Sequence, residues 1–128
     1  MQERPVYLDL TKIRLPISAF ISITHRLSGM YIFFITLPLG LSLINKSIKS
    51  KSSFEELLVE ISSVSFFSFF VILSFQIFLY HALTGVRHLI MDFFHVGESL
   101  DGSYYSAILT VCLWFLLCII LIGYIFIL

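Results

Sequence analysis

Three long stretches of this chain contain no Asp, Glu, Lys or Arg: residues 27–45, 61–86 and 102–128. An α-helix needs about 20 apolar residues to cross the hydrocarbon core of a bilayer, because each residue advances it by only about 1.5 Å. Backbone N–H and C=O groups in lipid must be paired within a helix or a closed barrel. The stretches are rich in Phe, Ile and Leu without the strict alternation of barrel strands. The sequence therefore predicts an all-α membrane protein with three transmembrane helices.

The composition leaves no room for a soluble catalytic domain. Of the 128 residues, 59% are hydrophobic and only 12% are charged, which is too little charge to cover the surface of a soluble domain. The formal net charge is zero, so no basic excess favours nucleic-acid binding. We expect a single transmembrane domain over residues 1–128. Its N-terminal segment 1–15 should lie on the cytoplasmic side, with helices at roughly 16–45, 62–94 and 104–127.

The distribution of Lys and Arg predicts the orientation. Five of these residues lie on the side of the N-terminus and the second connection, and three lie in the first loop: Arg4, Lys12, Arg14, Arg26 and Arg87 against Lys46, Lys49 and Lys51. Cytoplasmic segments carry the excess of positive residues, whereas acidic residues count little in this rule. The N-terminus is therefore expected inside. The first loop, residues 46–60, is expected to form about one interfacial helical turn.

Polar residues within the first two predicted helices recur with helical spacing. Pro16 suits the first position of a helix, because its φ is fixed and it has no backbone N–H to leave unpaired. In a helix continuing from Pro16, one stripe lies at i, i+3, i+4 and i+7: Ser22, His25, Arg26 and Gly29. In the second helix, a similar stripe lies at i, i+4, i+7 and i+11: His81, Gly85, His88 and Asp92. Each of the two helices is therefore expected to present one polar face.

Ionisable side chains inside a bilayer are costly, so these stripes should face protein. A charged side chain at mid-membrane costs about 2.5–3.5 kcal/mol on insertion scales. Arg26 or Arg87 alone is equally consistent with a side chain that reaches the headgroups. A single membrane histidine also more often packs or hydrogen-bonds than binds a metal. Three histidines and two arginines near the same membrane face instead favour a shared function, and Gly29 and Gly85 would let a flat group or another helix approach.

Two kinds of chemistry use such a set of residues. Imidazole is an axial ligand of haem iron, and arginine offers a permanent charge and forked donors for haem propionates. The cluster therefore matches a b-type haem pocket. Histidines and carboxylates also form proton relays in membranes. This leaves a small transporter or proton-relay membrane subunit, which would use the His/Arg/Asp cluster, as the alternative function. A structural assembly factor is a third.

Two segments of the chain resemble a known family. RPVYLDLTKIRLPISAFISITHRLSG, from Arg4 to Gly29, is similar to the RP–L–DL and S-x-x-HR-x-SG segments of the cytochrome b large membrane-anchor subunits of succinate dehydrogenase (respiratory complex II). YHALTGVRHLIMD, from Tyr80 to Asp92, resembles the H-x-x-x-G-x-RH-x-x-x-D segment of the same family. The resemblance covers essentially the whole chain, although the third helix matches only by hydropathy. It implies a three-helix membrane anchor of the succinate dehydrogenase/fumarate reductase type.

The resemblance implies a role for each polar residue of the stripes. His81 matches the axial ligand of haem b, whose second axial histidine comes from the small anchor subunit. His25, Arg26 and His88 match positions near the haem propionates. Ser22 and Arg26 match residues that line the ubiquinone pocket, and Asp92 matches an acidic residue near that pocket, as a candidate proton relay.

The resemblance also implies partners and location. The chain is expected to hold a flavoprotein and an iron–sulfur subunit at the inside face, and to form the quinone pocket together with the iron–sulfur and small anchor subunits. It would pass electrons from succinate oxidation to ubiquinone. The alternative within the same class is the anchor of a fumarate reductase, which catalyses the reverse reaction. It carries no flavin or iron–sulfur motif, so the isolated chain is not expected to turn over. The expected location is the bacterial inner membrane, or the mitochondrial inner membrane for an organelle-encoded chain.

The orientation can be tested by thiol labelling. We expect residues 1–14 and the Gly97–Tyr105 connection to be cytoplasmic and residues 46–60 to lie on the opposite side, because of the Lys and Arg asymmetry. Single-cysteine variants in a background without Cys112 and Cys118 would be treated with an impermeant reagent. Labelling of Ser50→Cys from the cytoplasmic side would show that the orientation is reversed.

Overall fold

The computed structural model describes residues 15–97 and 99–127, so most of the N-terminal segment 1–15 expected on the cytoplasmic side lies outside the described residues. The described part is helical and contains no strand. Its elements in order are α1 (Ile17–Tyr31), η2 (Ile32–Thr36), α2 (Leu37–Lys49), α3 (Lys51–Ser62), α4 (Phe66–Phe94) and α5 (Leu100–Ile127).

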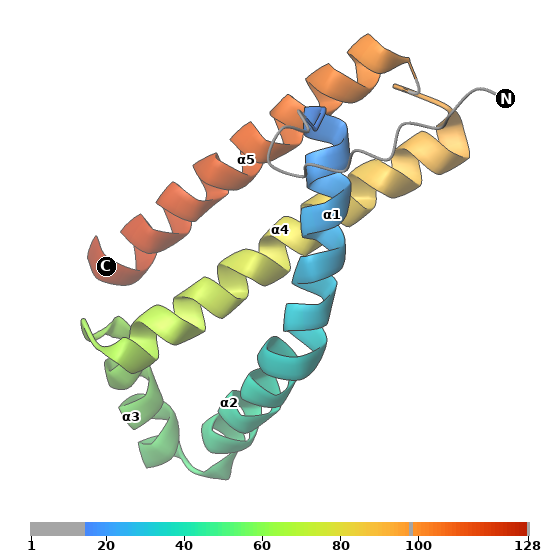
Figure 1. Cartoon of the computed structure of the whole chain (residues 1–128). Coiled ribbons are helices and arrows are strands. Elements are labelled where there is room, and N and C mark those ends of the chain that lie inside the picture. Colours follow the sequence, from blue (N-terminus) through green and yellow to red (C-terminus); the bar gives the residue numbers. More distant parts are fainter. Residues whose placement is uncertain (1–14, 98, 128) are drawn as a thin grey trace, which may run out of the picture.

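Three helical segments are long and apolar enough to cross a membrane. They are the continuous rod Ile17–Lys49, formed by α1, η2 and α2, then Phe66–Phe94, and Leu100–Ile125. The rod crosses α4, which contacts both α1 and α5 (Figure 1). This confirms the predicted all-α membrane fold.

The rod departs from α-helical geometry at η2, which is π-helical. Pro38 follows this segment in the first turn of α2. Proline has no backbone N–H, so it cannot donate to the carbonyl four residues earlier. A short π-helical turn accommodates this break in the hydrogen-bond ladder without ending the helix. The first transmembrane segment therefore remains one continuous rod.

The first connection is more ordered than expected, since α3 has 12 residues where the sequence predicted about one turn. The Ser50 side chain caps this helix by accepting a hydrogen bond from the backbone N–H of Ser53 at 3.1 Å. The buried Leu57 packs inward, and Lys46 of α2 pairs with Glu60 of α3 at 2.8 Å. The N-cap and these inward contacts favour a full helix over a polar loop.

Arg87 ties the start of α5 to α4. Its side chain is 7% exposed, its Nε donates to Ser106 Oγ at 3.0 Å, and a terminal nitrogen donates to the Ser103 carbonyl at 3.0 Å. A buried charge needs such hydrogen bonds to offset its desolvation. Arg87 therefore meets partners inside the protein and does not extend to the headgroups.

We expect Arg87→Met to destabilise the subunit by about 1.5–3 kcal/mol, because hydrogen bonds from a charged donor contribute about that much. Lys49→Met is the matched control, since Lys49 is exposed and bonds to no other residue in the described part of the chain. Thermal unfolding of the purified complex measures the effect. The same Tm for both variants would contradict the role of Arg87.

Candidate functional site

The two polar stripes meet where α1 crosses α4. Ser22, His25 and Arg26 of α1, together with four residues of α4, line a hollow of 460 Å³: His81, Gly85, His88 and Leu89. The His25 and His81 rings stack with their centroids 4.1 Å apart and their planes 8° from parallel. The His88 ring lies 5.4 Å from His25 at a tilt of 52°. The structure thus brings three predicted histidines into one cluster.

Each helix contributes a glycine that makes room for a histidine of the other. A Cβ added at Gly29 on α1 would lie 3.1 Å from Cε1 of His81 on α4. A Cβ added at Gly85 on α4 would lie 3.3 Å from Nε2 of His25 on α1. Both distances are shorter than ordinary van der Waals contact between carbon or nitrogen atoms. The glycines therefore allow the two helices to approach closely enough for the imidazole rings to stack.

The hydrogen bonds of His81 determine which of its nitrogens carries the proton. Nδ1 lies 3.1 Å from the backbone carbonyl of His25 and 3.0 Å from Ser28 Oγ. The Ser28 hydroxyl donates its proton to the same carbonyl at 2.7 Å. A carbonyl only accepts, and a hydroxyl that has donated its proton can then only accept. Nδ1 of His81 is therefore the donor, which leaves the lone pair on Nε2.

Polar atoms of three other side chains at the site make no hydrogen bond within the described chain. His25 Nε2 is buried and makes no hydrogen bond to the described residues. Arg26 is exposed, and neither its guanidinium nor the Ser22 hydroxyl bonds to any described residue. In contrast, Thr24 and Ser28 on the same helix donate back to its carbonyls. Buried polar groups in proteins are nearly always paired, so this site has the character of one that binds something else.

Two residues differ from the site predicted from the sequence: Asp92 does not line the hollow, and Ser28, which was not predicted, contacts His81. Asp92 is exposed on α4, one turn beyond His88, and is not among the residues that line the hollow. Ser28 had no assigned role, although it lies in the HR-x-SG segment, yet it contacts His81 directly. Two signals in the sequence could have indicated it: its place in that segment and its position one turn after His25.

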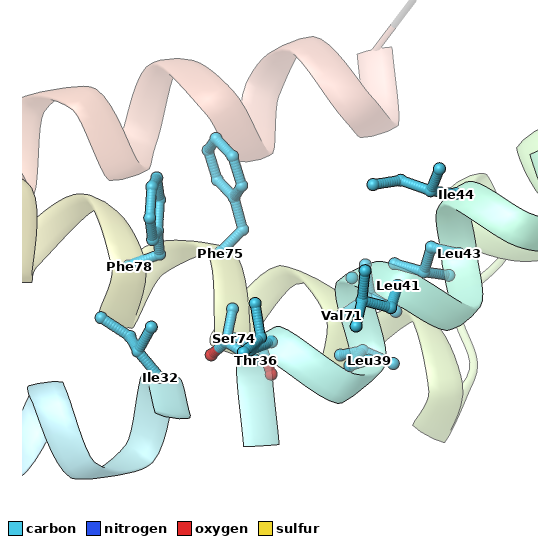
Figure 2. A pocket seen from close by; sticks show the side chains of 12 residues that line it. Ile32, Thr36, Leu39, Leu41, Leu43, Ile44, Val71, Ser74, Phe75 and Phe78 are labelled. Atoms are coloured by element: carbon cyan, nitrogen blue, oxygen red, sulfur yellow. The ribbon is translucent and has the colours of Figure 1, made fainter. Parts of the chain in front are cut away.

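A larger cavity elsewhere has no charged or imidazole side chain among its described lining residues. It has a volume of 580 Å³, lies between the η2–α2 segment and α4, and is lined by apolar side chains apart from Thr36 and Ser74 (Figure 2). The Ser74 hydroxyl is paired with Tyr31 at 3.1 Å, which leaves the Thr36 hydroxyl as the unpaired polar group of this lining among the described residues. Ligand sites combine a concave surface with a few convergent polar groups. The smaller hollow at the histidines meets that condition better than the larger cavity.

The sequence matches the family described as succinate dehydrogenase/fumarate reductase transmembrane subunit over residues 1–121. The chain belongs to this family. It is similar to the succinate dehydrogenase cytochrome b556 subunit of Coxiella burnetii, with 37% identity over 90 residues that cover 70% of this chain and 71% of the relative. It is also similar to the succinate dehydrogenase cytochrome b560 subunit of Porphyra purpurea, with 38% identity over 91 residues, 70% of this chain and 71% of the relative.

Family membership confirms the resemblance inferred from the two motifs. The chain is a cytochrome b membrane subunit of the succinate dehydrogenase/fumarate reductase type, and so a subunit of an oxidoreductase complex. The matched region includes α1 and α4 in full, and with them the hollow and its three histidines.

Proposed function

We propose that this chain is the membrane-anchor cytochrome b subunit of a succinate:ubiquinone oxidoreductase, which binds haem b with a small anchor subunit and helps to form the ubiquinone-reduction site. The observation that carries the proposal is the state of His81. Its Nδ1 proton is held by the His25 carbonyl and Ser28 Oγ, so Nε2 keeps its lone pair next to Gly29. Metal-ligating histidines commonly have this arrangement.

The residues of the site fit a haem better than a bare metal ion. Within the described residues, no group of three or more His, Cys, Asp or Glu side chains is placed to hold an ion directly. A haem iron requires only axial ligands from protein, because the porphyrin supplies the other donors. His81 would be one axial ligand, and the small anchor subunit would provide the second.

The unpaired donors fit the propionates of that haem. Two carboxylates inside a membrane need cationic or strongly donating partners. His25 Nε2 is buried without a partner in the described chain, and Arg26 and His88 line the same hollow. We assign His25, Arg26 and His88 to this role. When bound, the haem would supply a carrier that takes up and releases one electron at a time.

Ser22 and Arg26 are assigned to the quinone. They lie one turn apart on α1, both line the hollow, and both have side-chain donors that are free within the described chain. Ser22 would donate a hydrogen bond to a quinone carbonyl and orient the ring. Arg26 would stabilise the negative charge that grows on the quinone oxygens as the ring is reduced. Asp92, on the exposed side of α4 beyond His88, would pass protons toward the pocket.

The partners follow from the same proposal. The small anchor subunit and the iron–sulfur subunit would complete the quinone pocket, and the flavoprotein subunit would oxidise succinate. Because the sequence carries no flavin or iron–sulfur motif, this chain would not turn over alone. The complex would reside in the bacterial inner membrane, or in the mitochondrial inner membrane for an organelle-encoded chain, with the N-terminus inside.

We expect His81→Ala to abolish six-coordinate haem b, whereas His88→Ala should retain it, because His81, unlike His88, has its Nδ1 proton fixed by acceptors among the described residues. Optical and EPR spectra of the assembled complex measure the coordination. Loss of six-coordinate haem in His88→Ala, with retention in His81→Ala, would reverse the assignment.

We expect Arg26→Leu to lower quinone reduction by roughly a hundredfold, since a charge-assisted donor acting in the transition state contributes about 2–4 kcal/mol. Ser22→Ala should lower it by roughly fivefold, because a neutral hydrogen bond contributes about 1 kcal/mol. Succinate oxidation with an artificial acceptor at the soluble subunits should continue in both variants.

The two assays together separate quinone binding from assembly. Equal loss of quinone and artificial-acceptor activity would indicate a failure to assemble. Full quinone activity of both variants in an intact complex would contradict the quinone assignment and would favour a purely structural role for Ser22.

A further inference from the structure

We propose that Ser28 is a positioning residue that holds the His81 ring and sets the electron donation of its Nε2, and through it the potential of the iron. This inference rests on the proposed function, in which His81 is an axial ligand. It assigns a role to a side chain that does not line the hollow at the histidines.

Ser28 is placed to act on His81 rather than on its own helix alone. The residue is 6% exposed, and its Oγ donates to the His25 carbonyl at 2.7 Å. Helical serines often make such a bond to a carbonyl one turn earlier and bond to nothing else. Here the same oxygen also accepts from Nδ1 of His81 at 3.0 Å, across the contact between α1 and α4.

Nδ1 of His81, Oγ of Ser28 and the carbonyl oxygen of His25 are all hydrogen-bonded to one another. The Nδ1 proton is shared between Ser28 Oγ and the His25 carbonyl, and the hydroxyl proton goes to that carbonyl. Because the hydroxyl proton is already committed, Ser28 cannot donate to Nδ1 and stabilise the other tautomer. The set fixes both the proton position and the orientation of the ring.

An acceptor on Nδ1 changes the chemistry at Nε2. It draws the Nδ1 proton partly away, which makes the imidazole more electron-donating at its other nitrogen. A more donating axial ligand favours the oxidised iron and lowers its reduction potential. Loss of the Ser28 hydroxyl should therefore raise the potential, and the His25 carbonyl that remains should keep His81 bound.

Thr24 provides a matched control on the same helix. Its hydroxyl donates to the Ile21 carbonyl one turn earlier, as Ser28 does to that of His25, and it also bridges α1 to α4. Its partner on α4 is the Tyr80 hydroxyl at 2.5 Å, and it makes no hydrogen bond to a histidine in the described residues. Thr24→Val removes a bridging hydroxyl at the same helix contact and leaves the His81 hydrogen bonds in place.

The experiment compares Ser28→Ala, Ser28→Thr and Thr24→Val in the purified complex by redox titration of the haem and by low-spin EPR. Ser28→Ala should raise the midpoint potential and move the largest g value, which reports the orientation of the axial imidazole planes. Ser28→Thr keeps the hydroxyl and should restore both readouts. Thr24→Val should match the wild type.

Ser28→Cys provides a second variant in case Ser28→Ala does not assemble. Its thiol is a weaker acceptor of similar size, so the potential should shift in the same direction by a smaller amount.

Two results would overturn the inference. One is an unchanged potential and g value in Ser28→Ala and Ser28→Cys with haem present, and the other is an equal shift in Thr24→Val, which would indicate general loosening of the helix contact. Failure of the proposed function would look different, because the wild-type complex would then lack a reducible haem b or would keep its six-coordinate signal in His81→Ala.

Discussion

The close crossing of α1 and α4 is the contact on which the rest of this structure depends. Gly29 faces His81 and Gly85 faces His25, so each helix leaves space for the imidazole of the other. Without a hydrophobic driving force between helices in lipid, such contacts rely on small residues, close packing and interhelical hydrogen bonds. The stacked rings and the bonds of Ser28 supply the last two.

This crossing also explains why one face of the helix pair can carry polar residues. The Arg87 guanidinium donates to Ser103 and Ser106 of α5, whereas Arg26 and Ser22 have no partner in the described chain. Among the described residues, Arg87 is therefore bonded within the chain, whereas Arg26 is not. A subunit that completes its sites only with partners would have this division, because an unpaired donor in lipid is costly until it meets its acceptor.

The sequence predicted what depends on local patterns and missed what depends on contacts between helices. Uncharged stretches of helical length predicted the three transmembrane segments, and the spacing of polar residues predicted that the stripes share a site. It did not predict that Arg87 turns toward Ser103 and Ser106, because the direction of a long side chain depends on its neighbours. Ser28 was missed because serine is frequent in membrane helices. The length of α3 follows from inward contacts such as Leu57.

The most direct measurement is the position of the haem iron relative to the α1–α4 crossing in a cryo-electron microscopy map of the assembled complex. We expect the iron to be bonded to Nε2 of His81, with Nδ1 still in hydrogen-bonding contact with the His25 carbonyl and Ser28 Oγ. An iron bonded to His25 or His88, or a haem located away from this hollow, would contradict it.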